Sequence, residues 1–145
     1  MLQFSTAKEG LKILPIQISS KTNLKELSVD IKEALMDQDK KASIITPTNL
    51  TKYGADHTYI PFSQNPVKQV EELDRGFIKR LKQGNPRKVL EYYEDHSMNT
   101  ENIIGLLFTL IHTKPEEVLL EQYYGTNEFT GDDKNFITFA SMILK

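Results

Sequence analysis

The stretch NPVKQVEELDRGFIKRLKQG, residues 65–84, has the pattern of one complete amphipathic helix. Asn65 is followed by a proline at the first helical position, where its missing N–H costs nothing, and Gly84 ends the segment. Between these ends, apolar side chains recur at the spacings that form one stripe on a helix. The stripe consists of Val67, Val70, Leu73, Phe77, Ile78 and Leu81. The stretch therefore predicts a helix whose apolar side packs into a core.

Helix signals continue towards the C-terminus. Asn85-Pro86 opens a second predicted helix in the same way as the first. A third, capped by Asn99 or Thr100 and running to about residue 112, is apolar nearly all round and is expected at the centre. Proline and two glutamates predict a fourth helix over 115–124. For 135–144 we favour a helix, although the apolar and β-branched residues there also suit a strand.

The N-terminal part has a different pattern. Residues 2–6 and 11–18 alternate apolar and polar side chains around a polar turn, which predicts a β-hairpin. Asn23 can cap a helix that follows it. We therefore predict an α+β fold, an N-terminal β-hairpin and helix followed by a mainly helical C-terminal bundle of four to five helices. The whole chain, 1–145, is expected to be a single domain, with an α/β half over 1–46, a loop over 47–65 and a helical half over 66–145.

The residue types that carry common catalytic chemistry are sparse. The 145 residues include no cysteine and three histidines. The lack of thiols excludes disulfides, thiolate nucleophiles and cysteine-ligated zinc. No two histidines have a zinc-ligand spacing, and no phosphate-binding glycine loop or nucleophile elbow occurs. We therefore expect no catalytic residues, no cofactor and no metal. The alternative is a small enzyme with a dispersed site near His57, which lies beside Asp56.

Charge is distributed unevenly along the chain. Residues 1–90 hold fifteen basic and ten acidic side chains, whereas residues 91–133 hold one basic and ten acidic side chains. The densest cations form the basic patch, and helix-end electrostatics account for only some of them. The basic patch consists of Lys79, Arg80, Lys82, Arg87 and Lys88.

The acidic stretch also contains tyrosines near the predicted helix ends, a composition common at protein interfaces. These residues form the second candidate surface, the acidic/aromatic face. It consists of Glu94, Asp95, Glu116, Glu117, Glu121, Tyr93 and Tyr124.

These observations predict a non-enzymatic protein–protein interaction protein, such as an adaptor, an assembly chaperone or an inhibitor. A surface of opposite charge on each half can steer a protein partner, or a second copy of the chain head to tail. Nucleic acid binding through the basic patch is a less favoured alternative, because the predicted helix over 115–124 would present acids to phosphates. No secretory signal or membrane-spanning run is apparent, so we expect a cytoplasmic protein without membrane contact.

Overall fold

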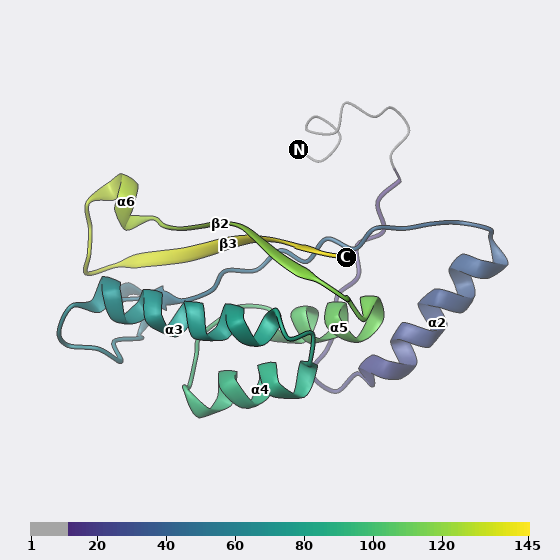
Figure 1. The fold of residues 1–145 in the computed structure, drawn as a ribbon, viewed down its shortest axis with the longest axis horizontal. Coiled ribbons are helices and arrows are strands. Elements are labelled where there is room, and N and C mark those ends of the chain that lie inside the picture. The colour runs from purple at the N-terminus through teal and green to yellow at the C-terminus, as the bar shows by residue number, and fades with distance from the viewer. Residues whose placement is uncertain (1–11) are drawn as a thin grey trace.

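The computed structural model describes residues 12–145, and its main body is an antiparallel sheet with helices on one side (Figure 1). The strand order is β1-β3-β2. The strands are β1 (Lys52–Tyr53), β2 (Val118–Gly125) and β3 (Phe136–Leu144). The helices beside the sheet are α3 (Pro66–Leu81), α4 (Pro86–Asp95) and α5 (Ile103–Thr113). The remaining elements are α2 (Leu24–Asp37), η1 (Ala55–His57), a turn of 3-10 helix, and α6 (Asn127–Thr130).

Strands β2 and β3 form the long pair of the sheet. They run antiparallel, and their register pairs Val118 with Leu144 at one end and Gly125 with Thr138 at the other. The connection between them contains the short helix α6. On its other side, β3 pairs with the two residues of β1. This short pairing brings a segment from the middle of the chain against the C-terminal strand.

These strands contradict the predicted helices over 115–124 and 135–144. Each segment is rich in aromatic and aliphatic side chains that fit a sheet as well as a helix, so local propensity did not decide between them. Pairing decides it. Tyr124 and Phe139 lie opposite each other in the register, and their rings stack with centroids 5.4 Å apart. The fold is therefore α+β, but its strands lie mostly in the C-terminal part, and the predicted C-terminal helical bundle is wrong.

The predicted helices over 65–84 and from 85–86 onward are confirmed. Five of the six predicted stripe residues of α3 are buried, and the sixth, Val67, packs against the core from its edge. In α4, the side chain of Asn85 accepts hydrogen bonds from two backbone N–H groups of the first turn. Both helices begin with proline and bury one face, as their sequences predict.

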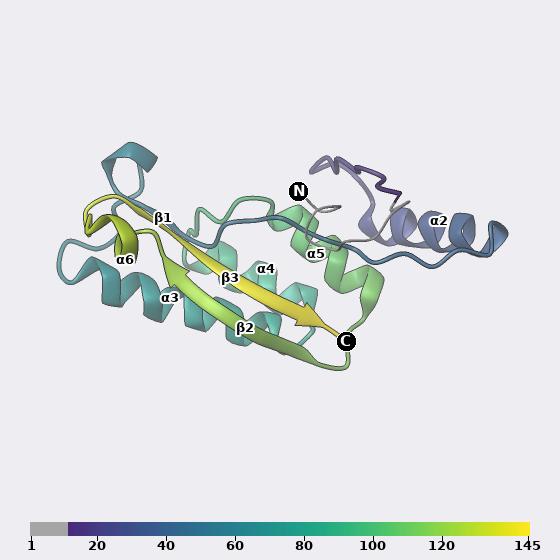
Figure 2. The same ribbon diagram turned by 90° about the horizontal axis from the view of Figure 1, so that it is seen from above.

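The N-terminal part differs from the prediction. Among the described residues, 12–18 are in no strand, and the first half of the predicted hairpin lies outside the described residues. The predicted helix cap at Asn23 is confirmed, since its side chain accepts from two backbone N–H groups of α2. Figures 1 and 2 show α2 standing out at one end of the molecule, where it packs along α5. Within the described range, no helix combines the length and the apolar character needed to cross a bilayer.

Candidate functional site

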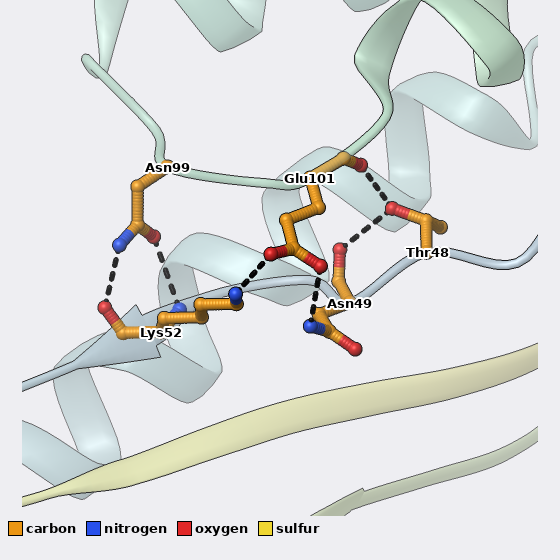
Figure 3. A network of polar contacts seen from close by, with 5 residues as sticks. All are labelled: Thr48, Asn49, Lys52, Asn99 and Glu101. Carbon is orange, nitrogen blue, oxygen red and sulfur yellow. Dashed lines mark hydrogen bonds and ion pairs between the residues drawn. The ribbon is translucent and has the colours of Figure 1, made fainter. Parts of the chain in front are cut away.

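A partly exposed group of polar side chains lies where the segment before β1 meets the segment before α5 (Figure 3). We call it the Lys52–Glu101 cluster. It consists of Thr48, Asn49, Lys52, Asn99 and Glu101. About fifty residues separate its two halves in the chain, so only the folded structure brings them together.

Asn99 holds the backbone of Lys52 with both ends of its amide. The Lys52 N–H donates to Asn99 Oδ1 at 3.0 Å, and Asn99 Nδ2 donates to the Lys52 carbonyl oxygen at 2.6 Å. This two-point contact copies the pairing of a β-strand neighbour, because one residue supplies both a donor and an acceptor. It fixes the position of β1 relative to the start of α5. The site is therefore held rigidly at its backbone.

Lys52 and Glu101 form the charged centre of the cluster. The ammonium group of Lys52 pairs with Oε1 of Glu101, and Asn49 Nδ2 donates to Oε2 at 2.9 Å. Thr48 donates from its hydroxyl to the Glu101 backbone carbonyl oxygen. The Lys52 side chain is 24% exposed and that of Glu101 is 55% exposed. Both charges can therefore be reached from solvent while their positions are set by neighbours.

Thr100 adds an unusual feature between two cluster residues. Its side chain is 4% exposed, and its hydroxyl makes no hydrogen bond with any of the described residues. A buried polar group left without a partner costs about 1–3 kcal/mol. Such groups are uncommon in folded proteins and call for an explanation. Thr100 lies between the cluster residues Asn99 and Glu101, so the unsatisfied group is part of the segment that forms the cluster.

The cluster retains hydrogen-bonding capacity beyond its internal contacts. An ammonium group has three donors, and the Glu101 contact uses one of those of Lys52. The carboxylate of Glu101 likewise has lone pairs beyond the two contacts that it makes. A molecule that presents an acceptor to Lys52 and a donor to Glu101 can therefore bind both without loss of the surrounding framework.

A second polar group lies inside the protein, centred on Asp74 of α3. Asp74 is 0% exposed. It accepts hydrogen bonds from Thr51 at 2.6 Å, from Thr138 at 2.5 Å and from Tyr123 at 2.9 Å. Burial raises the pKa of the Asp74 carboxyl, while the three hydroxyl donors oppose that rise. Burial, and next the charge of Asp74, raise the pKa of the Tyr123 hydroxyl. Because these groups satisfy one another in the interior, we interpret them as a structural tie between α3 and the sheet.

Comparison with known families gives a match over almost the whole chain. Residues 1–143 match the family model described as Memo-like protein. The chain belongs to the Memo-like family. No curated protein sequence matches it.

The match overturns the predicted function. Memo-like proteins are thought to be dioxygenase-like enzymes, which conflicts with the prediction of a non-enzymatic adaptor, chaperone or inhibitor. That prediction rested on the uneven distribution of charge and on the absence of familiar catalytic motifs, and a dispersed site leaves no such motif. Membership of the Memo-like family does not by itself decide whether this chain is an enzyme.

The residues of the predicted basic patch lie at the adjoining ends of α3 and α4 in this Memo-like chain. Some already have partners: Arg87 pairs with Glu91 at 2.8 Å, and Arg80 lies over the ring of Tyr92 at 5.6 Å from its centroid. Lys79, Lys82 and Lys88 are exposed. Binding of a partner by this patch remains a prediction.

The predicted acidic/aromatic face is divided between two elements. Glu94 and Asp95 lie at the end of α4, whereas Glu116, Glu117 and Glu121 lie in and just before β2. In Figure 1, α4 lies further from the sheet than α3. Binding of a partner by these residues remains a prediction. Both tyrosines are partly buried: Tyr93 packs against the core and Tyr124 stacks on Phe139.

The sequence analysis missed the Lys52–Glu101 cluster because Asn99 was interpreted as a helix cap. Asn102 has that role, since its Oδ1 accepts from the N–H of Gly105 at 3.1 Å, and Asn99 is left to hold Lys52. The structure fixes the backbone beside the cluster at a further point. Gly54 closes the turn after β1 with φ 122°, and a Cβ there would lie 2.3 Å from the Lys134 carbonyl oxygen. This glycine marks a fixed backbone beside the cluster.

Proposed function

We propose that this Memo-like chain binds a small polar molecule at the Lys52–Glu101 cluster, as the substrate-recognition part of a dioxygenase-like activity. The observation that carries the proposal is the meeting of one ammonium and one carboxylate, both accessible, on a backbone fixed by Asn99. Groups held in place before a ligand arrives bind it at a lower entropic cost.

The charges of the cluster define the ligand class. Lys52 favours an anionic or strongly accepting group, and Glu101 favours a cationic or donating group close to it. A ligand with only one of these groups would pair with one side chain and be repelled by, or leave unsatisfied, the other. We therefore propose a ligand that carries both, of which an amino-acid zwitterion is the simplest type.

Family membership supports an enzymatic setting for this binding. Memo-like proteins are thought to be dioxygenase-like enzymes, and an enzyme needs polar groups that orient its substrate. The Asp74 group offers no comparable access, because its carboxylate is fully buried.

The test is a titration of the ¹⁵N-labelled chain with three small probes, followed by amide chemical shifts. Glycine carries both charged groups, while acetate and methylammonium carry one each. We expect glycine to shift the amides around residues 48–53 and 99–102 at lower concentration than either single-charge probe. If no probe shifts these amides, or if acetate and glycine act alike, the proposal is wrong.

Variants assign the effect to the two charges. Replacing the lysine (Lys52→Met) or the carboxylate (Glu101→Gln) should weaken glycine binding about tenfold, or about 1.4 kcal/mol, because each removes a charge-assisted contact. Lys68→Met and Glu72→Gln are matched controls, since Lys68 and Glu72 also form an ion pair, at 3.9 Å, but on the exposed surface of α3. These controls should leave glycine binding unchanged.

A further inference from the structure

The family attribution raises a question about metal. A dioxygenase-like reaction implies a metal that activates oxygen, and the common arrangement for non-haem iron is two histidines and one carboxylate on one side of the ion. The donor atoms of this chain can be compared with that requirement. The comparison depends on the family match and on geometry, and it is independent of the ligand proposed for the Lys52–Glu101 cluster.

The available donors do not meet the requirement. The chain has three histidines and no cysteine. Within residues 12–145, no three side chains from His, Cys, Asp and Glu lie close enough to hold a metal ion together. Residues 1–11 add one carboxylate, Glu9, and no histidine. A triad with two histidines would therefore need two of the three described imidazoles to meet.

The three histidines lie on different elements, and two of them have other partners. In α5, Nδ1 of His112 lies 3.2 Å from the Ser28 hydroxyl oxygen. At the end of α4, Nδ1 of His96 lies 2.9 Å from the Tyr92 carbonyl oxygen, and its ring stacks on that tyrosine with centroids 3.9 Å apart. His57 is in η1, which follows β1 in the chain, whereas the cluster residues 48–49 precede β1. These contacts engage Nδ1 of each ring, and Nε2 could still ligate an ion. What speaks against a triad with two histidines is that no three potential ligands within residues 12–145 lie close enough to share an ion.

The carboxylates in the two polar groups are also engaged. Glu101 is bonded to Lys52 and Asn49, and the ammonium group of Lys52 would repel a metal cation there. Both oxygens of Asp74 already accept hydrogen bonds from buried hydroxyls. Asp74 cannot ligate an ion without leaving buried hydroxyls unpartnered, and an ion at Glu101 would lie against the ammonium group of Lys52.

We infer that this chain does not build the iron site of a dioxygenase-like reaction from its own residues. Its contribution to such a reaction, which rests on the function proposed above, is recognition of the substrate, and the metal ligands come from outside residues 1–145. In this chain, the Memo-like fold therefore forms without a metal-binding site of its own.

The experiment measures metal binding directly. The full chain is dialysed anaerobically against Fe(II), and in parallel against Co(II) and Zn(II), and the bound metal is counted per chain by mass spectrometry. Co(II) also reports its ligands through its visible absorption. We expect well under one ion per chain and a cobalt spectrum like that of the free ion in buffer. The variants His57→Ala and His96→Ala should give the same residual binding as the unchanged chain.

One Fe(II) or Co(II) ion per chain, with a cobalt spectrum that shows nitrogen ligands, would overturn the inference. Stoichiometric binding that survives both histidine substitutions would overturn it as well, because the site would then be built from other side chains. Glycine titration of the same sample keeps the two proposals apart. Loss of the metal inference leaves the glycine shifts intact, and absence of glycine shifts leaves the metal count unchanged.

Discussion

The body of the molecule and the segment around α2 are held together in different ways. The body, residues 49–145, contains every buried large apolar side chain of the described range. The α2 arm, residues 12–48, buries only Ser28 and carries six of the nine most exposed large apolar side chains, among them Leu14 at 80% and Met36 at 76% exposed. The comparison shows that one chain can combine a well-packed domain with an arm that adds little to its core.

Polar contacts tie each region, but their environments differ. In the body, Asp74 joins α3 to the sheet from a site without solvent. Side-chain hydrogen bonds join the arm to α5, among them Ser28 with His112 at 3.2 Å and Thr46 with Thr109 at 2.5 Å, and the cap residue Asn102 donates to the Pro47 carbonyl oxygen at 3.1 Å. Loss of a fully buried contact leaves its partners without hydrogen bonds, whereas water can reach the partly exposed His112 when its contact with Ser28 is lost. The regions should therefore respond differently to equivalent substitutions.

The largest effect on stability is expected when the body loses the Asp74 carboxylate, which links α3 to the sheet. Replacing Asp74 with alanine removes the acceptor of three buried hydroxyls, so we expect the free energy of unfolding to fall by about 3–5 kcal/mol. Chemical denaturation followed by circular dichroism measures this change. The matched substitution in the arm, Asp30→Ala, removes an exposed carboxylate of α2 and should change stability by less than about 0.5 kcal/mol. An equal fall in the free energy of unfolding for both variants would show that the body does not depend on its buried carboxylate more than the arm depends on an exposed one.

A smaller effect is expected when the arm loses a contact. Ser28→Ala removes the hydroxyl that meets His112 and should cost about 1 kcal/mol, felt as easier opening of α2 and not as unfolding of the body. Amides of α2 should then exchange with solvent about fivefold faster, while those of α3 keep their rates. Ser20→Ala, at an exposed turn position, is the control and should leave exchange in both helices unchanged. Faster exchange in α3 would show that the arm and the body open together.

The sequence predicted the helices of the body because their signals are local. Proline at the first position and an apolar stripe define α3 within twenty residues, and the structure buries that stripe. The strands could not be predicted in this way. The pairing of Tyr124 with Phe139 is a contact between segments, and neither segment alone distinguishes a strand from an apolar helix.

The Lys52–Glu101 cluster was out of reach of the sequence for a related reason. Lys52 and Asn99 are separated by 47 positions and share no motif, so only the pairing of β1 with β3 and the packing of α5 bring them together. Charge counting along the chain identified basic and acidic regions, but it could not show that Lys52 from the first and Glu101 from the second meet. The same counting grouped the residues of the acidic/aromatic face along the chain, and the fold places them on α4 and on or just before β2.

The smallest effect concerns pH and tests the attachment of the arm again. Burial is the main cause that lowers the pKa of His112, the charge of Lys32 adds to it, and the contact with Ser28 opposes both. The unfolded chain therefore binds a proton at a higher pH than the folded one, so this contribution to stability is present above about pH 6.5 and is lost as the pH falls through the lowered pKa. We expect exchange of the α2 amides to show this loss first, because His112 lies at the contact with α2 and remains partly exposed.

Lys32→Met should weaken the pH dependence by removing a repelling charge, whereas Lys25→Met, at the opposite end of α2, should not. If the two lysine variants have the same pH profile, the attachment of the arm does not depend on the charge state of His112.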